Sequence, residues 1–291
     1  MSLARPSYTP ASPTVVLTRA DCASTEAEKE EMSKAPYCEY RSLVGSVMYL
    51  NASTRPDTAF AVAQLTTAMD NPGKAHWNEL MVLLRYLRGT KAKGIVFRRD
   101  PISASGFPTV APRDEVPTME EGRREHVARM EESLGSQAIG FADSDYARND
   151  TNRRSVSGYI VYVNGGPVAW NCKTQRHVAL STMEAEIDAA TELCKEAVFT
   201  RALLEEMGIE QVRPMSIYTD NQACLMVCEK GEIPTKAKHM AVRYFFVAEK
   251  IQERVVKMFY CPTSWMPADM LTKPLASTLV SRLRPFVLGR W

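Results

Sequence analysis

The sequence of 291 residues has no apolar run of the roughly 18 residues that a membrane-spanning helix needs. Its first residues, MSLARPSYTPASPTVV, lack a charged segment followed by a long apolar core, so we expect no secretory signal. Seven cysteines form no C-x-x-C pair, which leaves zinc unsupported and favours a reducing compartment over a disulfide scaffold. The net charge is only +2, so the chain as a whole carries no electrostatic signature of nucleic-acid binding.

The first third of the chain is predicted to be helical behind a tail. Residues 1–36 are rich in Pro, Ser and Thr and then in charge, which predicts a tail with at most a short helix. Residues 37–97 have apolar residues at helical spacing, with a break at Pro56 and a stop at Gly89, and they end in a predicted strand over 93–100. We expect a compact, mainly helical unit here.

The rest of the chain changes character twice. Residues 98–136 are punctuated by prolines and then highly charged, which indicates a linker or insertion. Residues 137–278 alternate between strand and helix patterns, with an Asn-Gly-Gly hairpin turn at 164–166 and a long helix over 181–208. The predicted order is β-β-β-α-β-α-α-β-α. Residues 279–291 are expected to be a C-terminal tail.

Four acidic residues of the second half lie at or near the ends of predicted elements. Asp143 and Asp220 close two predicted strands, while Glu186 and Asp269 lie in predicted helices. A carboxylate at the end of a buried strand costs desolvation unless something pairs with it. Carboxylates that converge from separate elements are best explained by a bound divalent metal, and oxygen-rich sites suit Mg²⁺ or Mn²⁺. Taken singly, each acid is better explained as a solvated surface charge, and it is the set of four in order that favours a metal site.

The sequence segments around these acids resemble those of the ribonuclease H domain of Ty1/copia-type retrotransposon polyproteins. The matching runs are FADSDYARND, RRSVSGYIVYVNGGPVAWNCKTQ, VALSTMEAEIDAATELCKEA, IYTDNQA, KHMAVRYFFVAEKI and CPTSWMPADMLTKPL. The upstream helical unit resembles the thumb and connection region that follows the polymerase. The resemblance implies an α/β fold class: a ribonuclease H-like five-stranded mixed sheet flanked by helices, preceded by a small, mainly helical connection domain.

The resemblance also implies roles for the four acids. Asp143 matches the residue that bridges two metal ions, Glu186 the helix residue that holds one ion and senses the ribose, and Asp220 and Asp269 the remaining ligands. Two Mg²⁺ ions about 3.5–4 Å apart, or Mn²⁺ as a substitute, would then drive cleavage of the RNA strand of RNA–DNA hybrids. Glu184 is the competing candidate, because two residues that are two positions apart on a helix face different ways.

Polar residues near the acids are further candidates for substrate contact. They are Arg153, Ser157, Lys173, Gln175, Asn221, Gln222 and His239. For His239 a helix-capping role is an equal alternative. Gly158 is expected to let the hybrid backbone approach, and Trp170 to pack in the core.

Departures from the family pattern keep a second interpretation open. The loop PTSWMPAD lacks the mobile His of the cellular enzymes, the 98–136 segment is longer than expected, and no Tyr-Val-Asp-Asp polymerase motif is present. We expect the polymerase portion of the same polyprotein as a partner, no membrane partner, and a cytoplasmic (virus-like particle) or nuclear location rather than secretion. The alternative is an inactive or repurposed remnant that binds nucleic acid or a protein. A transposase or integrase fits less well, because its acidic triad has a different spacing.

Overall fold

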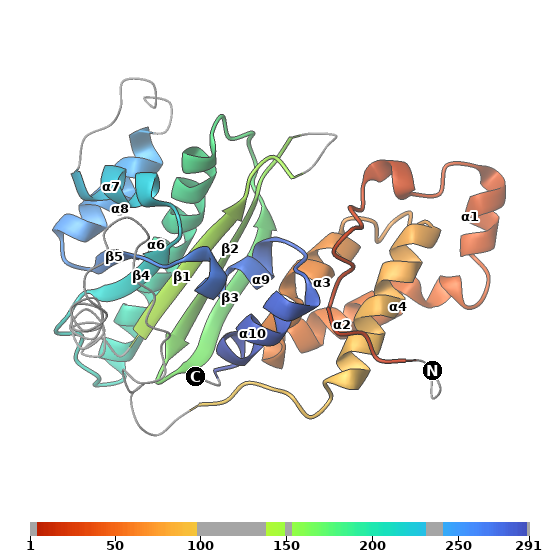
Figure 1. Cartoon of the computed structure of the whole chain (residues 1–291), viewed down its shortest axis with the longest axis horizontal. Coiled ribbons are helices and arrows are strands. Elements are labelled where there is room, and N and C mark those ends of the chain that lie inside the picture. Colours follow the sequence, from red (N-terminus) through yellow and green to blue (C-terminus); the bar gives the residue numbers. More distant parts are fainter. Residues whose placement is uncertain (1–4, 98–137, 149–152, 231–240, 290–291) are drawn as a thin grey trace.

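The computed structural model describes residues 5–97, 138–148, 153–230 and 241–289. Figure 1 shows a β-sheet half and a helical half side by side, with the last helices of the chain between them. In the described part, no helix is both long enough and apolar enough to cross a membrane. The predicted linker over 98–136 lies outside the described residues.

The helical half is formed by four helices. They are α1 Glu26–Met32, α2 Tyr40–Thr54, α3 Ala59–Thr66 and α4 Lys74–Gly89. Pro56 opens the short turn η3, Pro56–Thr58, at the predicted break, because proline fits the first turn of a helix. Helix α1 falls inside the predicted tail, where Thr25 and Glu28 form a capping box.

The segment expected to be a tail packs against this half. Ala23 and Met32 are buried, and the amide of Asn71 donates to the carbonyl oxygen of Ala23 at 2.9 Å. Ser12 donates its hydroxyl to the Glu79 carboxylate at 2.6 Å. Residues 5–36 are therefore largely part of the folded body.

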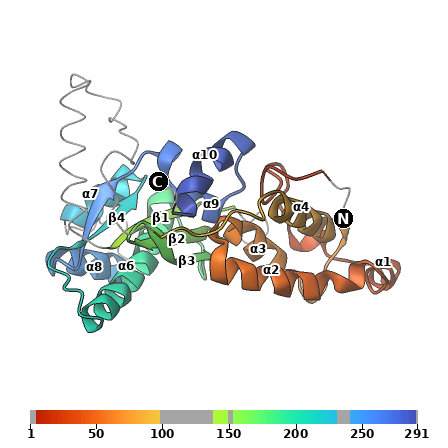
Figure 2. The same cartoon turned by 90° about the horizontal axis from the view of Figure 1, so that it is seen from below.

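The predicted fold class is confirmed in the second half, where a mixed sheet of five strands lies between helices (Figures 1 and 2). The strands are β1 Ala138–Asp145, β2 Val156–Val163, β3 Gly166–Thr174, β4 Met215–Thr219 and β5 Val256–Tyr260. Their order is β3-β2-β1-β4-β5. β1, β2 and β3 are antiparallel neighbours, while β1, β4 and β5 run parallel.

The hairpin between β2 and β3 forms as the sequence predicts. Asn164 and Gly165 both have positive φ, 49° and 74°. Such a pair of left-handed residues is what a two-residue hairpin turn needs.

Each face of the sheet is covered by its own layer of helices. One face packs on α6 Thr182–Glu206, α7 Gln222–Lys230 and α8 Ala241–Gln252. The other packs on α9 Asp269–Thr272 and α10 Ser277–Val287, and on helices of the N-terminal half. A single core cluster includes Val44 of α2, Phe141 of β1 and Leu283 of α10. The helical half and the sheet half thus share one hydrophobic core.

Two predicted segments differ in the structure. Most of the predicted C-terminal tail is helix α10, which buries Val280, Leu283 and Val287 at helical spacing. The segment predicted as a strand over 93–100 forms no strand over its described part, 93–97. There the Val96 N–H donates to the carbonyl oxygen of Leu288 at 2.9 Å, just beyond the end of α10.

Candidate functional site

The parallel pairing of β1 and β4 brings two of the predicted acids together. Phe141 of β1 is opposite Tyr218 of β4. Asp143 and Asp220 each follow two residues later, so they stand at the same height at the carboxyl ends of neighbouring parallel strands. This edge is where ligand sites form in sheets of this kind. The Asp143 side chain is buried, and that of Asp220 is half-buried and accepts a hydrogen bond from Thr263 Oγ1 at 2.8 Å.

Glu186 reaches the same edge of the sheet from helix α6, which covers one face of it. Ser181 caps helix α6 by accepting from the Glu184 N–H, which fixes where the helix begins. Glu186 Oε1 accepts from the backbone N–H of Ser144 at 3.1 Å and from its hydroxyl at 2.8 Å. Its Oε2 accepts from Thr219 Oγ1 at 3.4 Å. The two residues that hold Glu186 are thus the chain neighbours of the two strand acids.

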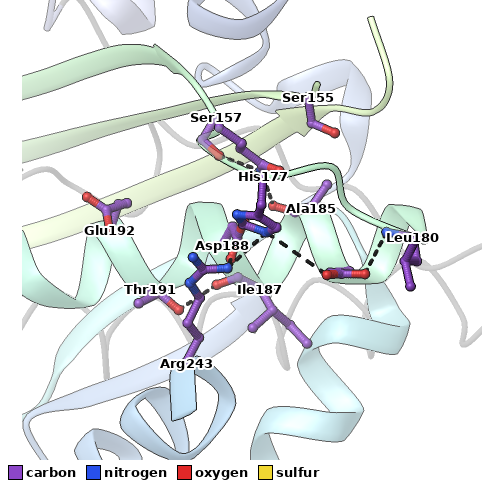
Figure 3. Close-up of polar contacts among 12 residues, drawn as sticks. Ser155, Ser157, His177, Leu180, Ala185, Ile187, Asp188, Thr191, Glu192 and Arg243 are labelled. Atoms are coloured by element: carbon purple, nitrogen blue, oxygen red, sulfur yellow. Dashed lines mark hydrogen bonds and ion pairs between the residues drawn. The ribbon is translucent and has the colours of Figure 1, made fainter. Parts of the chain in front are cut away.

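Glu184 points elsewhere, which resolves the choice between the two helix acids. Its carboxylate accepts from the Leu180 N–H at 2.6 Å and lies 4.0 Å from His177 Nε2. His177 and Leu180 belong to the loop that precedes α6 (Figure 3). Of the two, only Glu186 lies with Asp143 and Asp220, as chosen from the sequence.

Three carboxylates form a group that suits a metal ion. One oxygen each of Asp143, Glu186 and Asp220 lies within 4.8 Å of the others. Carboxylate oxygens are the ligands that hard divalent cations prefer. Like charges this close and this buried are costly without a cation, so the donor set fits Mg²⁺ or Mn²⁺ and identifies neither.

The fourth acid joins this group through helix α9. Asp269 opens α9, and its side chain is only 3% exposed. Lys273 Nζ lies 2.9 Å from Asp269 Oδ1 and 3.6 Å from Asp143 Oδ2. Thr272 Oγ1 also donates to Asp143 Oδ2. Asp269 is therefore next to the three-carboxylate group, with an ammonium between it and Asp143.

Crowding of negative charge changes the acidity of these groups. Burial, followed by repulsion from Asp143 and Asp220, raises the pKa of Glu186 well above its ordinary value. Burial and Asp143 likewise raise the pKa of Asp220. Burial raises the pKa of Asp269 to about 8, with Asp143 adding to the shift and Lys273 opposing it. A bound cation would stabilise the ionised carboxylates and so lower these pKa values.

Comparison with known proteins gives the chain a family. No family model matches it. The Pol polyprotein "Retrovirus-related Pol polyprotein from transposon TNT 1-94" of Nicotiana tabacum is 34% identical over 274 residues, which is 94% of this chain. The chain belongs to the Pol polyproteins of retrotransposons. It spans 18% of the length of the tobacco Pol polyprotein.

Two further similarities concern smaller parts of this Pol family chain. The "Secreted RxLR effector protein 161" of Plasmopara viticola is 35% identical over 160 residues, which cover 55% of the chain and 89% of that protein. Among solved structures, ribonuclease H1 from Halobacterium salinarum is 15% identical with a TM-score of 0.35, over 46% of this chain and 93% of its own. Nothing about function follows from structural likeness at that level.

Several residues predicted to contact substrate have structural partners in the Pol family chain. Gln175 is buried, and its Nε2 donates to Ser157 Oγ at 2.8 Å and to the Ala185 carbonyl at 3.0 Å. Asn221 Oδ1 accepts from the Cys224 N–H, so it caps α7. These contacts hold the strands and helices in place.

A glycine is needed at position 158 for a different reason from the one predicted. It is opposite Asp143 in the β1–β2 pairing. A Cβ at this position would lie 2.7 Å from Thr272 Cγ2 and 3.0 Å from Leu271 Cβ. The glycine therefore admits helix α9 to the sheet and not a nucleic-acid backbone.

The other predicted contacts lie at the surface, with one outside the described residues. Arg153, Lys173 and Gln222 are exposed. His239 falls within 231–240, outside the described residues. Trp170 packs against the shared core as predicted, and its indole N–H donates to the Asn51 carbonyl at 3.1 Å.

Five supporting residues were missed from the sequence. They are Ser144, Thr219, Thr263, Thr272 and Lys273. Four of them are direct neighbours of an acid or lie three or four residues after Asp269, so closeness in sequence to Asp143, Asp220 or Asp269 was the available signal. Thr263 had no such signal, because the loop fold alone brings it to Asp220.

Proposed function

We propose that the chain hydrolyses the RNA strand of RNA–DNA hybrids endonucleolytically and with divalent metal, as the ribonuclease H part of a retrotransposon polyprotein. One observation carries the proposal: Asp143, Glu186 and Asp220 converge at the carboxyl edge of the sheet. Family membership and the fold class support it. Mg²⁺ is the proposed cofactor, because the ligands are carboxylates without nitrogen or sulfur donors.

The protein's part in this chemistry is to hold oxygen ligands in place. Asp143, Glu186, Asp220 and Asp269 would hold the metal, which supplies Lewis-acid polarisation of a phosphoryl oxygen and a water made acidic by coordination. Ser144 fixes the orientation of Glu186 through two hydrogen bonds, so this ligand is set before any ion binds. Thr263 and Thr272 do the same for Asp220 and Asp143.

A polar cavity beside the site is the proposed place for the backbone of the hybrid. It has a volume of about 320 Å³ and lies between β3, α6 and the start of α8. Its lining includes the basic Lys173, Arg176, Lys195 and Arg243, and of these Lys195 is paired with Glu192 and Arg243 with Asp188. Cationic side chains of this kind bind phosphate without reading sequence. Gln175 and Ser157 both line the cavity and are hydrogen-bonded to each other. Ser157 is opposite Ser144 of β1, the residue that follows Asp143.

The two glutamates of α6 provide a matched test. We expect Glu186→Gln to lower Mg²⁺-dependent cleavage of a labelled hybrid by about 100-fold or more, because it removes one ligand charge. Glu184→Gln should keep the wild-type rate, since an amide oxygen can still accept from Leu180. Equal rates for wild type and Glu186→Gln, or no cleavage by wild type, would refute the proposed activity.

A second candidate function follows from the Plasmopara viticola relative. That protein is named an effector, and this chain covers 89% of it. The observation favours a repurposed chain that keeps the fold and binds nucleic acid or a protein without cleaving hybrids. Intact Mn²⁺ binding with no turnover by the wild-type protein would favour this candidate.

The proposed function also implies a partner for this chain and a place in the cell. The polymerase portion of a Pol polyprotein would make the hybrid, so it is the proposed partner. A cytoplasmic particle or the nucleus is the proposed location. Co-purification of this chain with a polymerase segment of the same element would test the pairing.

A further inference from the structure

Lys273 lies between two of the four acids of the site. Its Nζ is 2.9 Å from Asp269 Oδ1 and 3.6 Å from Asp143 Oδ2. The lysine side chain is 27% exposed, and the two carboxylates are 3% and 2% exposed. This ion pair is therefore inside the site, in contrast to surface pairs such as Lys29–Glu26, where the side chains are 49% and 91% exposed.

The lysine divides the four acids into two groups. Asp143, Glu186 and Asp220 form the group whose oxygens lie within 4.8 Å of one another. Asp269 is outside that group and is paired with the ammonium. Asp143 belongs to both, because its Oδ2 also lies 3.6 Å from Lys273 Nζ. An ammonium is a compact point charge with three donors, so it can satisfy the carboxylate oxygens that a metal ion would otherwise take.

We propose that Lys273 occupies the second cation position of this site. One divalent ion then binds at Asp143, Glu186 and Asp220, and a second binds only when Nζ leaves Asp143 and Asp269. The inference rests on the proposed metal-dependent function. It makes Lys273 a positioning residue for the acids in the metal-free protein.

The backbone at Lys273 allows such a displacement. The residue follows α9 in an extended conformation, with φ −145° and ψ 154°. Its four-carbon stem can swing the ammonium outward without moving the helix that carries Asp269. A displaced ammonium remains beside the acids and can donate to a substrate phosphate. Removal of Lys273 should therefore tighten the second ion while slowing turnover, two effects of opposite sign.

Calorimetric titration of the full chain with Mn²⁺ tests the proposal. We expect one tight ion in the wild type and a second that binds about tenfold or more weakly, because it competes with an internal cation. Lys273→Met should tighten the second ion by about tenfold. Lys29→Met is the control, since it removes the same charge from an exposed ion pair on α1 and should leave the isotherm unchanged.

The outcomes separate this inference from the proposed function. Two ions of equal affinity in the wild type, or the wild-type isotherm in Lys273→Met, would overturn it whether or not hybrids are cleaved. Lys273→Gln also removes the charge but keeps a polar side chain, and it should tighten the second ion as well, so it decides the matter if Lys273→Met fails to fold. Lys273→Arg keeps the charge and should keep the weak second ion. Failure to cleave hybrids with the expected isotherms would overturn the activity alone.

Discussion

Individual acids of the site bind protons more tightly in the folded chain than in the unfolded one. The pKa values of Glu186, Asp220 and Asp269 are raised, that of Asp269 to about 8. All four acids were chosen from the sequence, Asp143 and Asp220 also by their place at predicted strand ends, and Glu186 was preferred to Glu184 by the family motif. The contacts with Lys273 could not be predicted from the sequence, because they depend on how α9 packs against β1.

Proton linkage at these acids predicts a pH effect on stability. A folded pKa above the unfolded one stabilises the chain fully below the unfolded value, and this contribution is lost as pH rises through the folded value. In EDTA, the free energy of unfolding should therefore fall between about pH 4 and pH 8, by at most about 1.4 kcal/mol per pH unit for each group. Mg²⁺ or Mn²⁺ should reverse this trend, because the ion binds the ionised form.

Chemical denaturation at pH 5, 6.5 and 8, with EDTA and with Mn²⁺, measures this linkage. Asp269→Asn is the useful comparison, since it removes one titrating group and should flatten the EDTA curve. A flat profile in EDTA would contradict the raised pKa values, and the same pH slope in EDTA and in Mn²⁺ would contradict the metal site.

Among the helices and strands, local signals fixed some boundaries and left others open. The start of α6 was predicted near residue 181, where either Ser181 or Thr182 could cap the helix, and Ser181 is the cap. The β2–β3 hairpin was predicted because Asn164 and Gly165 tolerate positive φ. The apolar spacing of α10 was available in the sequence and was missed. Residues 93–97 have strand-like composition, yet the N–H of Val96 bonds the end of α10, a partner that only the tertiary fold supplies.

Contact between β2 and α9 predicts a sharp effect at Gly158. Gly158→Ala should destabilise the chain by about 1–3 kcal/mol, because its Cβ would press on Thr272 and Leu271. The same shift should weaken Mn²⁺ binding, since Thr272 donates to Asp143. Gly45→Ala is the control: Gly45 lies within α2 with nothing near its Cβ position, so alanine there should stabilise by about 1 kcal/mol. Thermal unfolding and Mn²⁺ titration of both variants would show opposite signs, and equal signs would refute the packing account.

The whole molecule is held together by contacts far apart in the sequence, which is why its domain division was the hardest feature to predict. Composition separates a helical region from an α/β region, and that contrast is real at the level of elements. The core nevertheless runs through both, from Val44 in α2 to Phe141 in β1. Turn η3 contacts both α9 and α10, so the helical half supports the helix that carries Asp269.

A buried ion pair in η3 should therefore stabilise both halves at once. Arg55 binds Asp57 through two hydrogen bonds of 2.8 Å, and the Tyr86 hydroxyl donates to the same carboxylate at 2.7 Å. Asp57→Asn would leave a buried guanidinium without its counter-charge, at a cost of about 3–5 kcal/mol. Asp70→Asn is the control, because the Asp70–Arg41 pair is at the surface, with Asp70 96% exposed, and contributes about 1 kcal/mol or less.

Hydrogen exchange followed by mass spectrometry would show how far this loss spreads. If the shared core makes one cooperative unit, Asp57→Asn should speed exchange in α2–α4 and in β1 and β4 by a similar factor, whereas Asp70→Asn should change neither. Faster exchange confined to the helical half would mean that the two halves unfold separately. In that case α9 would keep its place without support from η3, and the acid site would owe its geometry to the sheet half alone.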